Sequence, residues 1–175
     1  MGSRTESIVL GGGCFWCTEA CFDLVEGVLT ATPGYAGGTT TDPTYEQVCR
    51  GKTGHAEVVR LEYDPARVSL GEILDIFFAS HDPTSLDRQG ADVGTQYRSI
   101  ILYGSSEQKA AVDAFIVELQ KEYSSPIVTE VRALDKFYPA EEYHRRYYAR
   151  NPGGGYCKAV ISPKVNEIKG RLGGP

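Results

Sequence analysis

The chain has 175 residues, of which 41% are hydrophobic and 23% are charged, as is typical of a soluble globular protein. Its 18 basic and 23 acidic residues leave a net charge of -5, and no dense Lys/Arg patch favours nucleic-acid binding. No apolar run approaches the ~20 residues that a membrane span needs, and the N-terminal MGSRTES lacks the apolar core of a secretory signal. We expect one soluble, cytoplasmic domain over residues 1–175.

The predicted elements begin with a strand and a helix that meet at three consecutive glycines. The β-branched run at 7–10 predicts a strand, and residues 14–25 predict a helix. Residues 26–38 are strand-like, but Pro33-Gly34 and the glycines after it favour a strand that breaks and runs into a turn.

Alternating strands and helices continue along the rest of the chain. Strands are predicted at 55–63, 99–103 and 127–134, and helices at 69–80, from Ser105 to Leu119, and at 140–150. This alternation favours a layered sheet with helices packed on it. Residues 151–157 are loop by composition, and we expect the glycine-rich tail at 151–175 to be coil-like and mobile.

The five cysteines, at 14, 17, 21, 49 and 157, form no even disulfide framework. In a reducing compartment they rest as thiols, and a disulfide among them is then more typical of a transient catalytic step. The cysteines therefore do not indicate a crosslinked scaffold.

Cys14 stands where the glycine loop meets the predicted helix at 14–25. A helix N-terminus lowers a thiol pKa through its unpaired N–H groups and the positive end of its dipole, and the thiolate is the reactive form. Free cysteines are most often small buried residues, but this position favours a nucleophile. Cys17 and Cys21 lie on the same side of the helix, and we expect that side to face the core.

Glu57 lies in the predicted strand at 55–63. Alternation places it on the same face as Val59, Leu61 and Tyr63, whereas the opposite face is more polar. A carboxyl group on the apolar face holds its proton more tightly, and a buried protonated Glu can donate a proton to a substrate oxygen. The alternative is an exposed residue at the end of a strand.

Two further groups are candidates for a pocket. Phe15 and Trp16, beside Cys14, either wall a small apolar pocket or anchor the helix on the sheet, and the sequence leaves both interpretations open. The polar, glycine-bearing segment at 92–98 leads into a predicted strand. Loops at strand ends often carry binding residues, although an ordinary connection would look the same.

Three other classes of protein compete at this point. Cys14 and Cys17 form the Cys-x-x-Cys pair that is typical of thioredoxin-like oxidoreductases. A zinc site needs four ligands, usually from two close pairs, whereas the sequence offers one pair and three isolated histidines, so we expect no metal. A non-catalytic binding module would leave Cys14 inert.

The segment GGGCFWCTEACF at 11–22 resembles the active-site segment of the A-type peptide methionine sulfoxide reductases. The resemblance continues through PGYAGG at 33–38, YEQVCRGKTGHAEVV at 45–59, YDP at 63–65, HDPTSLDRQGADVGTQYRS at 81–99, FYPAEEYH at 137–144 and GYCKAVISPK at 155–164. It covers nearly the whole chain in order, with several long and specific motifs.

The resemblance implies a mixed α/β (α+β) fold, a two-layer mixed-sheet sandwich of ferredoxin-like type, in a monomer without a cofactor. It also implies reduction of methionine S-sulfoxide, free or in proteins and peptides. Cys14 matches the nucleophile of the family and Glu57 its proton donor. Phe15 and Trp16 match the walls of the substrate pocket that receive the methyl group. Tyr45 and Tyr97 match tyrosines that hydrogen-bond near the sulfoxide oxygen. Asp92 matches a polar residue of the same substrate-binding pocket.

In the implied mechanism the Cys14 thiolate attacks the sulfoxide sulfur while Glu57 protonates the oxygen, which leaves a sulfenic acid on Cys14. A second thiol condenses with it to a disulfide, and thioredoxin or another dithiol reductant reopens that bond. Cys157, in the glycine-rich tail, resembles a resolving cysteine. Many relatives have Gly where this chain has Cys17, so Cys17 competes for the same role.

Overall fold

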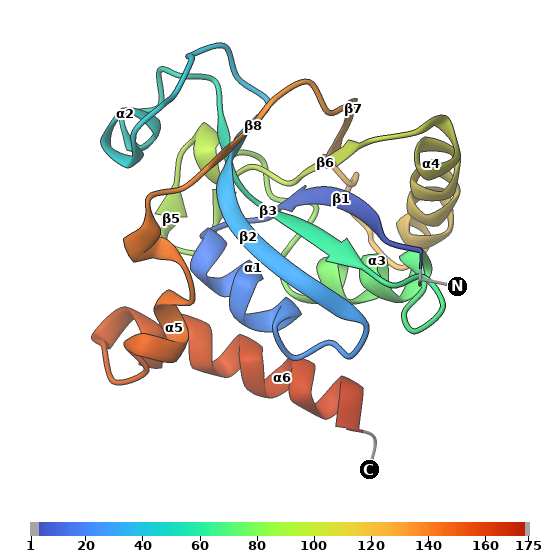
Figure 1. The fold of residues 1–175 in the computed structure, drawn as a ribbon. Coiled ribbons are helices and arrows are strands. Elements are labelled where there is room, and N and C mark those ends of the chain that lie inside the picture. Colours follow the sequence, from blue (N-terminus) through green and yellow to red (C-terminus); the bar gives the residue numbers. More distant parts are fainter. Residues whose placement is uncertain (1–3, 174–175) are drawn as a thin grey trace.

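A six-stranded mixed sheet forms the centre of the computed structural model, which describes residues 4–173 (Figure 1). Its strands are β1 (Glu6–Gly11), β2 (Val28–Ala36), β3 (Ala56–Tyr63), β6 (Ile100–Tyr103), β7 (Glu130–Ala133) and β8 (Phe137–Pro139). They lie in the order β7-β6-β1-β3-β2-β8. Neighbouring strands are antiparallel except β6 and β7, which are parallel. A separate pair of short strands joins β4 (Arg88–Gln89) to β5 (Asp92–Val93).

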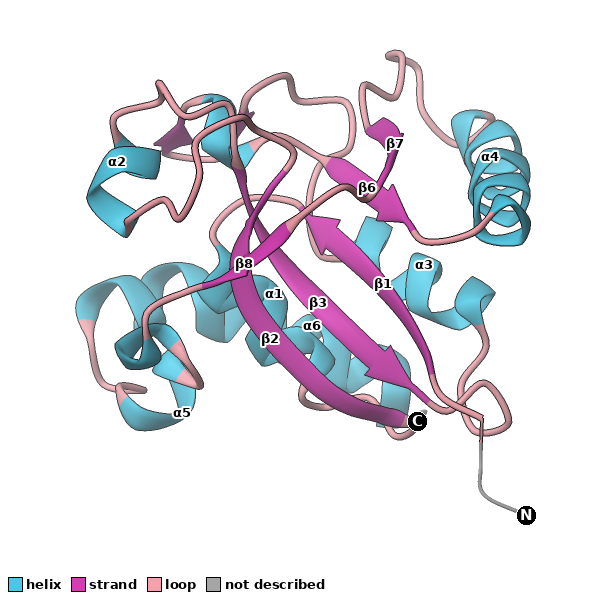
Figure 2. Ribbon diagram, turned by 45° about the horizontal axis from the view of Figure 1, so that its top comes forward, coloured by secondary structure: helices cyan, strands magenta, loops and turns pink. Residues whose placement is uncertain are grey.

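The helices pack mainly against one side of this sheet. They are α1 (Phe15–Phe22), α2 (Tyr45–Cys49), α3 (Leu70–Ala79), α4 (Ser106–Gln120), α5 (Tyr147–Arg150) and α6 (Ser162–Gly173), with short helical turns η1 (Thr95–Tyr97), η2 (Glu142–His144) and η3 (Cys157–Ile161). Figure 2 shows α1, α3 and α6 behind the sheet and α4 beside β6 and β7. When the short elements α2, β4, β5 and η1 are set aside, β1, α1, β2, β3, α3 and β6 give the chain order β-α-β-β-α-β.

The main core lies between the sheet and these helices. Alternation along β1 directs Ile8 and Leu10 to this side and Val9 to the other. The main cluster also contains Val59, Leu61, Phe22, Ile73, Phe77 and Ile101, all of them fully buried. Each apolar side chain of this size stabilises the fold by about 1.5–3 kcal/mol when it is buried. A smaller cluster on the opposite face is built from Val9, Ala36, Ala56, Val58, Ile100 and Leu102.

Most of the predicted elements are confirmed. Strands and helices are present at 7–10, 14–25, 55–63, 69–80, 99–103 and 127–134, and the helix that begins after Ser105 is present too, with shifted ends. The predicted break at Pro33-Gly34 is wrong, because β2 continues to Ala36. The Pro33 carbonyl accepts the N–H of Ala140, directly after β8. Because the nitrogen and the carbonyl of one strand residue point to the same side, the Pro33 nitrogen also faces β8 and not β3. The missing N–H therefore leaves the pairing with β3 intact.

The single helix predicted at 140–150 is wrong, because η2 and α5 replace it. Arg146, between them, has a φ of 53° and a ψ of 36°, the left-handed conformation that interrupts a helix. Its N–H donates to the carboxylate of Glu19, which lies 127 residues earlier in the sequence. Local helical pattern carries no information about such a distant contact, and the prediction fails for that reason.

The coil-like tail predicted over 151–175 is also wrong for most of its length. The chain is helical through η3 and α6, from Cys157 to Gly173, while residues 174–175 lie outside the described residues. Ile161, Val165 and Ile168 recur every three or four residues and are buried. Ile161 and Val165 pack in one cluster with Ala20 of α1. Burial of this apolar stripe stabilises a helix that the flanking glycines disfavour.

Gly34→Ala is expected to destabilise the protein, because an added Cβ would meet the Phe137 ring and lie 2.5 Å from the Tyr138 carbonyl oxygen. Overpacking of this kind costs about 1–3 kcal/mol in the free energy of unfolding. As a control, Gly71→Ala in α3 would place its Cβ 3.8 Å from the nearest atom, Ser69 Oγ, and should stabilise by about 0.5–1 kcal/mol. Urea unfolding measures both variants. Equal changes in the free energy of unfolding for Gly34→Ala and Gly71→Ala would contradict the close packing of β8 on β2.

Candidate active site

Cys14 lies at the N-cap of α1, directly after the glycine segment that ends β1. Gly13 has a φ of 93°, which turns the chain from the strand into the helix, and its N–H donates to the Tyr97 carbonyl at 3.2 Å. The Cys14 carbonyl accepts the N–H of Cys17 at 3.1 Å. A partly exposed thiol therefore stands at the start of the helix, where the sequence predicts it.

The thiol of Cys14 does not have the lowered pKa that its position predicts. Burial raises the pKa of Cys14 well above its ordinary value, and the charges of Glu57 and Cys17 raise it further. The backbone N–H of Trp16 and the hydroxyl of Tyr156 act in the opposite direction. The expectation from the helix terminus is therefore wrong in sign, because desolvation outweighs the hydrogen bonds offered to the thiolate.

Glu57 lies on β3 with its side chain fully inside the protein, at 1% exposure. Its Oε1 accepts the backbone N–H of Phe15 at 3.1 Å, whereas Oε2 has no hydrogen-bond partner among residues 4–173. Burial raises the pKa of Glu57 to about 8, the charge of Asp92 raises it too, and the Phe15 N–H lowers it. Burial therefore favours the protonated form of Glu57 at neutral pH, with one oxygen bonded to the Phe15 N–H and the other buried without a partner.

The charge of Glu57 acts on the thiol of Cys14. The charge of Glu57 is one of the causes that raise the pKa of Cys14, and it disappears when Glu57 carries a proton. A thiolate on Cys14 is thus favoured beside a neutral carboxylic acid and disfavoured beside a carboxylate. The arrangement therefore keeps an acid and a nucleophile together in one site.

Three tyrosines and one aspartate lie around this pair. Burial, followed by the charge of Glu57, raises the pKa values of Tyr45 and Tyr97, so both hydroxyls stay protonated and can donate hydrogen bonds. The Tyr156 hydroxyl contacts the Cys14 thiol and donates to Asp92 Oδ2 at 2.6 Å.

Sequence reasoning identified Tyr45, Tyr97 and Asp92 but missed Tyr156. The available signal was its place in the GYC motif, directly before Cys157.

The aromatic residues after Cys14 have different environments. Phe15 is 1% exposed and packs on Tyr35, with ring centroids 5.7 Å apart. Trp16 is half-buried, and its indole N–H donates to His144 Nδ1 at 3.0 Å. The Tyr147 ring stacks on the same indole, with centroids 3.7 Å apart and planes 8° apart. Phe15 thus packs in the core, while Trp16 lies against His144 and Tyr147, two residues that the sequence analysis did not place beside it.

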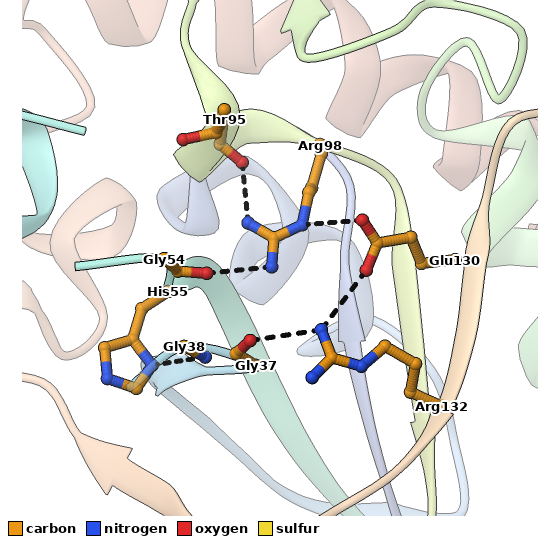
Figure 3. Close-up of polar contacts among 8 residues, drawn as sticks. All are labelled: Gly37, Gly38, Gly54, His55, Thr95, Arg98, Glu130 and Arg132. Carbon is orange, nitrogen blue, oxygen red and sulfur yellow. Dashed lines mark hydrogen bonds and ion pairs between the residues drawn. The ribbon is translucent and has the colours of Figure 1, made fainter. Parts of the chain in front are cut away.

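Arg98 connects the turn before β3, the η1 turn and strand β7 (Figure 3). Its buried guanidinium donates to the Gly54 carbonyl before β3 at 2.9 Å and to the Thr95 carbonyl of η1 at 3.0 Å. It also pairs with Glu130 of β7 at 3.1 Å, and Glu130 in turn bonds Arg132 at 3.4 Å. Because charge-assisted bonds are stronger than neutral ones, this network holds the start of β3 and the η1 turn in a fixed relation.

Cys157 lies at the start of η3. The sequence predicts a loop at this position, and that prediction is wrong. Cys157 is 1% exposed and packs in one cluster with Cys17, Ala20, Ile161 and Val165. Burial raises the pKa of Cys157, and it raises the pKa of Cys17 to about 11. All five cysteines are thiols in this structure. The fold therefore brings Cys157 against α1, the helix that Cys14 begins.

Residues 4–173 contain neither a cluster of metal ligands nor a helix that could span a membrane. No group of three or more His, Cys, Asp or Glu side chains within residues 4–173 could hold a metal ion. His55, His81 and His144 each bond protein groups in a different part of the fold. Over the same range, the helices lack the combination of length and apolarity that crossing a bilayer requires.

Comparisons with known proteins converge on one family. The sequence model described as "Peptide methionine sulfoxide reductase" matches residues 6–172. Over 165 residues the chain is 53% identical to the peptide methionine sulfoxide reductase MsrA of Haloquadratum walsbyi, which covers 94% of this chain and 95% of that relative. It is similar to the crystal structure of Mxr1 from Saccharomyces cerevisiae in reduced form, with a TM-score of 0.84 and 36% identity over 88% of this chain and 90% of Mxr1. Mxr1 in complex with Trx2 matches with a TM-score of 0.61 and 26% identity over 84% of this chain and 89% of that one.

Proposed function

The chain belongs to the family of peptide methionine sulfoxide reductases, and we propose that Cys14 is its nucleophile and Glu57 its proton donor. The protein reduces methionine sulfoxide to methionine. One observation carries the assignment of roles. The Glu57 carboxyl is buried, its pKa is raised to about 8, and its Oε1 is bonded to the residue after Cys14.

The first half-reaction uses these two groups together. The Cys14 thiolate attacks the sulfoxide sulfur while Oε2 of Glu57 gives its proton to the sulfoxide oxygen. The substrate S–O bond and the transient bond between the two sulfurs both break, a Cys14 S–O bond forms, and methionine leaves Cys14 as a sulfenic acid. Cys14 is oxidised and the substrate sulfur is reduced by the same two electrons. Glu57 regains a proton from solvent, which matches the proton that the Cys14 thiol released to solvent before the attack.

The substrate would be held by the groups that surround the pair. We propose that the substrate methyl group packs against Trp16, above the buried Phe15, and that the Tyr45 and Tyr97 hydroxyls donate hydrogen bonds near the sulfoxide oxygen. Asp92 acts on the site through its hydrogen bond from Tyr156 and through its charge, which raises the pKa of Glu57. We assign methionine S-sulfoxide, free or within proteins and peptides, as the substrate.

Cys157 is assigned to resolve the sulfenic acid. Its thiol attacks the sulfur of Cys14, releases water and forms a Cys14–Cys157 disulfide. The shared buried cluster of Cys157 and Cys17 against α1 supports this assignment and also makes Cys17 the alternative. Thioredoxin, or another dithiol reductant, would reopen the disulfide by exchange. The solved complex of the yeast relative Mxr1 with Trx2 supports this choice of partner.

The same proposal extends to the architecture and the setting. The β-α-β-β-α-β order and the adjacent strands β6-β1-β3-β2 support a two-layer sandwich of ferredoxin-like type in one domain. The odd number of cysteines, with no even disulfide framework, supports a reducing, cytoplasmic location. We assign the active form as a monomer.

Glu57→Ala is expected to slow methionine formation by about 10²- to 10⁴-fold, the usual contribution of a general acid. Glu57→Gln should retain more activity, because its amide N–H can still donate a hydrogen bond to the sulfoxide oxygen. Cys14→Ser should form no methionine and sets the baseline. Single-turnover assays with a methionine sulfoxide peptide measure all three variants. Equal rates for Glu57→Gln and Glu57→Ala would argue against donation by Glu57, and turnover by Cys14→Ser would refute the nucleophile.

Cys157→Ser is expected to complete one turnover and then stop when thioredoxin is the only reductant, because the sulfenic acid has no thiol to resolve it. Cys17→Ser, a change in the same buried cluster, should continue to turn over. Methionine release in the single-turnover and steady-state regimes separates the two steps. If Cys157→Ser keeps the wild-type steady-state rate and Cys17→Ser loses it, the resolving role belongs to Cys17.

A further inference from the structure

Glu19 is a buried carboxylate that the reaction described above does not use. It lies on α1 at 2% exposure, and this burial raises its pKa to about 7, although the hydrogen bond from the Arg146 backbone lowers it. Both of its oxygens accept the same donor, the backbone N–H of Arg146, at 2.9 Å each. The Arg146 guanidinium points elsewhere, with its Nε 3.9 Å from Asp23. The carboxylate of Glu19 therefore holds a piece of backbone and not a cation.

The backbone that Glu19 holds is strained. Arg146 is left-handed, with a φ of 53°, and the other non-glycine residues with positive φ in the described chain are Asp42 and Asp87. Aspartate tolerates this conformation through local hydrogen bonds of its own side chain, whereas arginine does not. A strained conformation persists only where surrounding contacts enforce it. The paired oxygens of Glu19 are the contact that enforces this one.

The turn at Arg146 lies between two residues that contact the Trp16 ring, which the Tyr156 ring also meets edge-on with centroids 5.9 Å apart. Two residues before Arg146, His144 accepts the indole N–H at 3.0 Å. One residue after it, Tyr147 stacks on the indole, with centroids 3.7 Å apart. Trp16 and Glu19 are three residues apart on α1, so they lie on one face of that helix. Helix α1 therefore contacts this turn twice. Glu19 accepts the N–H of Arg146, and Trp16 contacts His144 and Tyr147 on either side of it.

We propose that Glu19 is a positioning residue for the reduction of methionine sulfoxide: by fixing the left-handed turn at Arg146, it fixes the orientation of the Trp16 indole. This inference rests on the proposed role of Trp16 as a wall of the substrate pocket. Without the Glu19 side chain the turn at Arg146 relaxes. His144 and Tyr147 then no longer hold the indole of Trp16 in one position. The substrate then binds a less ordered wall, while the groups that react are unchanged.

The test uses the whole protein and a methionine sulfoxide peptide, with thioredoxin as reductant. Glu19→Ala should raise KM about tenfold with little change in kcat, since the hydrogen bond that fixes the turn at Arg146 is lost from the support of the pocket. Trp16 is the only tryptophan of the chain, so intrinsic fluorescence reports on this site alone. We expect its emission to shift to the red and its quenching by acrylamide to rise in the same variant.

Two matched variants identify the cause. Glu19→Gln keeps an oxygen that accepts the Arg146 N–H and should restore KM and emission close to wild type. Asp23→Ala removes a carboxylate from the same part of the chain, beside the Arg146 side chain, and should change neither quantity. The proposal is overturned if Glu19→Ala leaves both KM and emission unchanged, or if Asp23→Ala reproduces its effects. Should Glu19→Ala not fold, Glu19→Asp replaces it, because its shorter carboxylate draws back from the turn; wild-type values there overturn the proposal equally.

Trp16→Ala separates this inference from the function on which it rests. A large rise in KM in Trp16→Ala, together with unchanged values in Glu19→Ala, would refute the role of Glu19 alone. Unchanged KM in Trp16→Ala would instead refute the assignment of Trp16 to the substrate pocket, and the role of Glu19 would fall with it. Elevated KM in both variants is the result that we expect.

Discussion

The hydrogen bond from the Phe15 N–H to Oε1 of Glu57 is the contact on which the site depends. The donor is one of the N–H groups that a helix start leaves without a partner inside the helix. The acceptor is a carboxyl group buried in the sheet, where desolvation favours its protonated form. One interaction therefore fixes the acid against the residue that follows Cys14, while burial sets the charge of that acid. The same bond positions the proposed nucleophile and the proposed proton donor.

The sheet places these groups together. β1 lies between β6 and β3, and its register pairs Leu10 with Val59, so Glu57 lies opposite the glycine segment that leads to Cys14. The C-terminal part of the chain then closes the site from the other side. η2, α5 and η3 supply aromatic rings and the Cys157 thiol, and they are held against α1 by buried contacts (Figure 1). The central sheet thus provides the reacting pair, and the C-terminal segment provides the wall and the second thiol.

The sequence predicted the positions of Cys14 and Glu57 better than it predicted their surroundings. Alternation along 55–63 placed Glu57 on the apolar face correctly, because a strand repeats every two residues regardless of distant contacts. The opposite face was expected to be polar, yet Ala56 and Val58 are fully buried there by a second cluster that includes Ile100. The helix after Cys157 was missed because the five-residue glycine-rich segment before it dominates the local composition. The lowered pKa expected for Cys14 was wrong because a helix start is visible in the sequence, whereas desolvation is a property of the folded state.

The central claim is that Glu57 holds a proton at neutral pH and is ready to deliver it. Infrared difference spectroscopy between the wild-type protein and Glu57→Gln tests this directly, since a carboxylic acid and a carboxylate absorb at different frequencies. At about pH 6 an ordinary glutamate, with a pKa near 4.3, is ionised. We predict a carboxylic acid band at that pH which is absent from Glu57→Gln and disappears as the pH rises through about 8. A carboxylate band at about pH 6 would show that Glu57 is already ionised and would contradict its role as the acid.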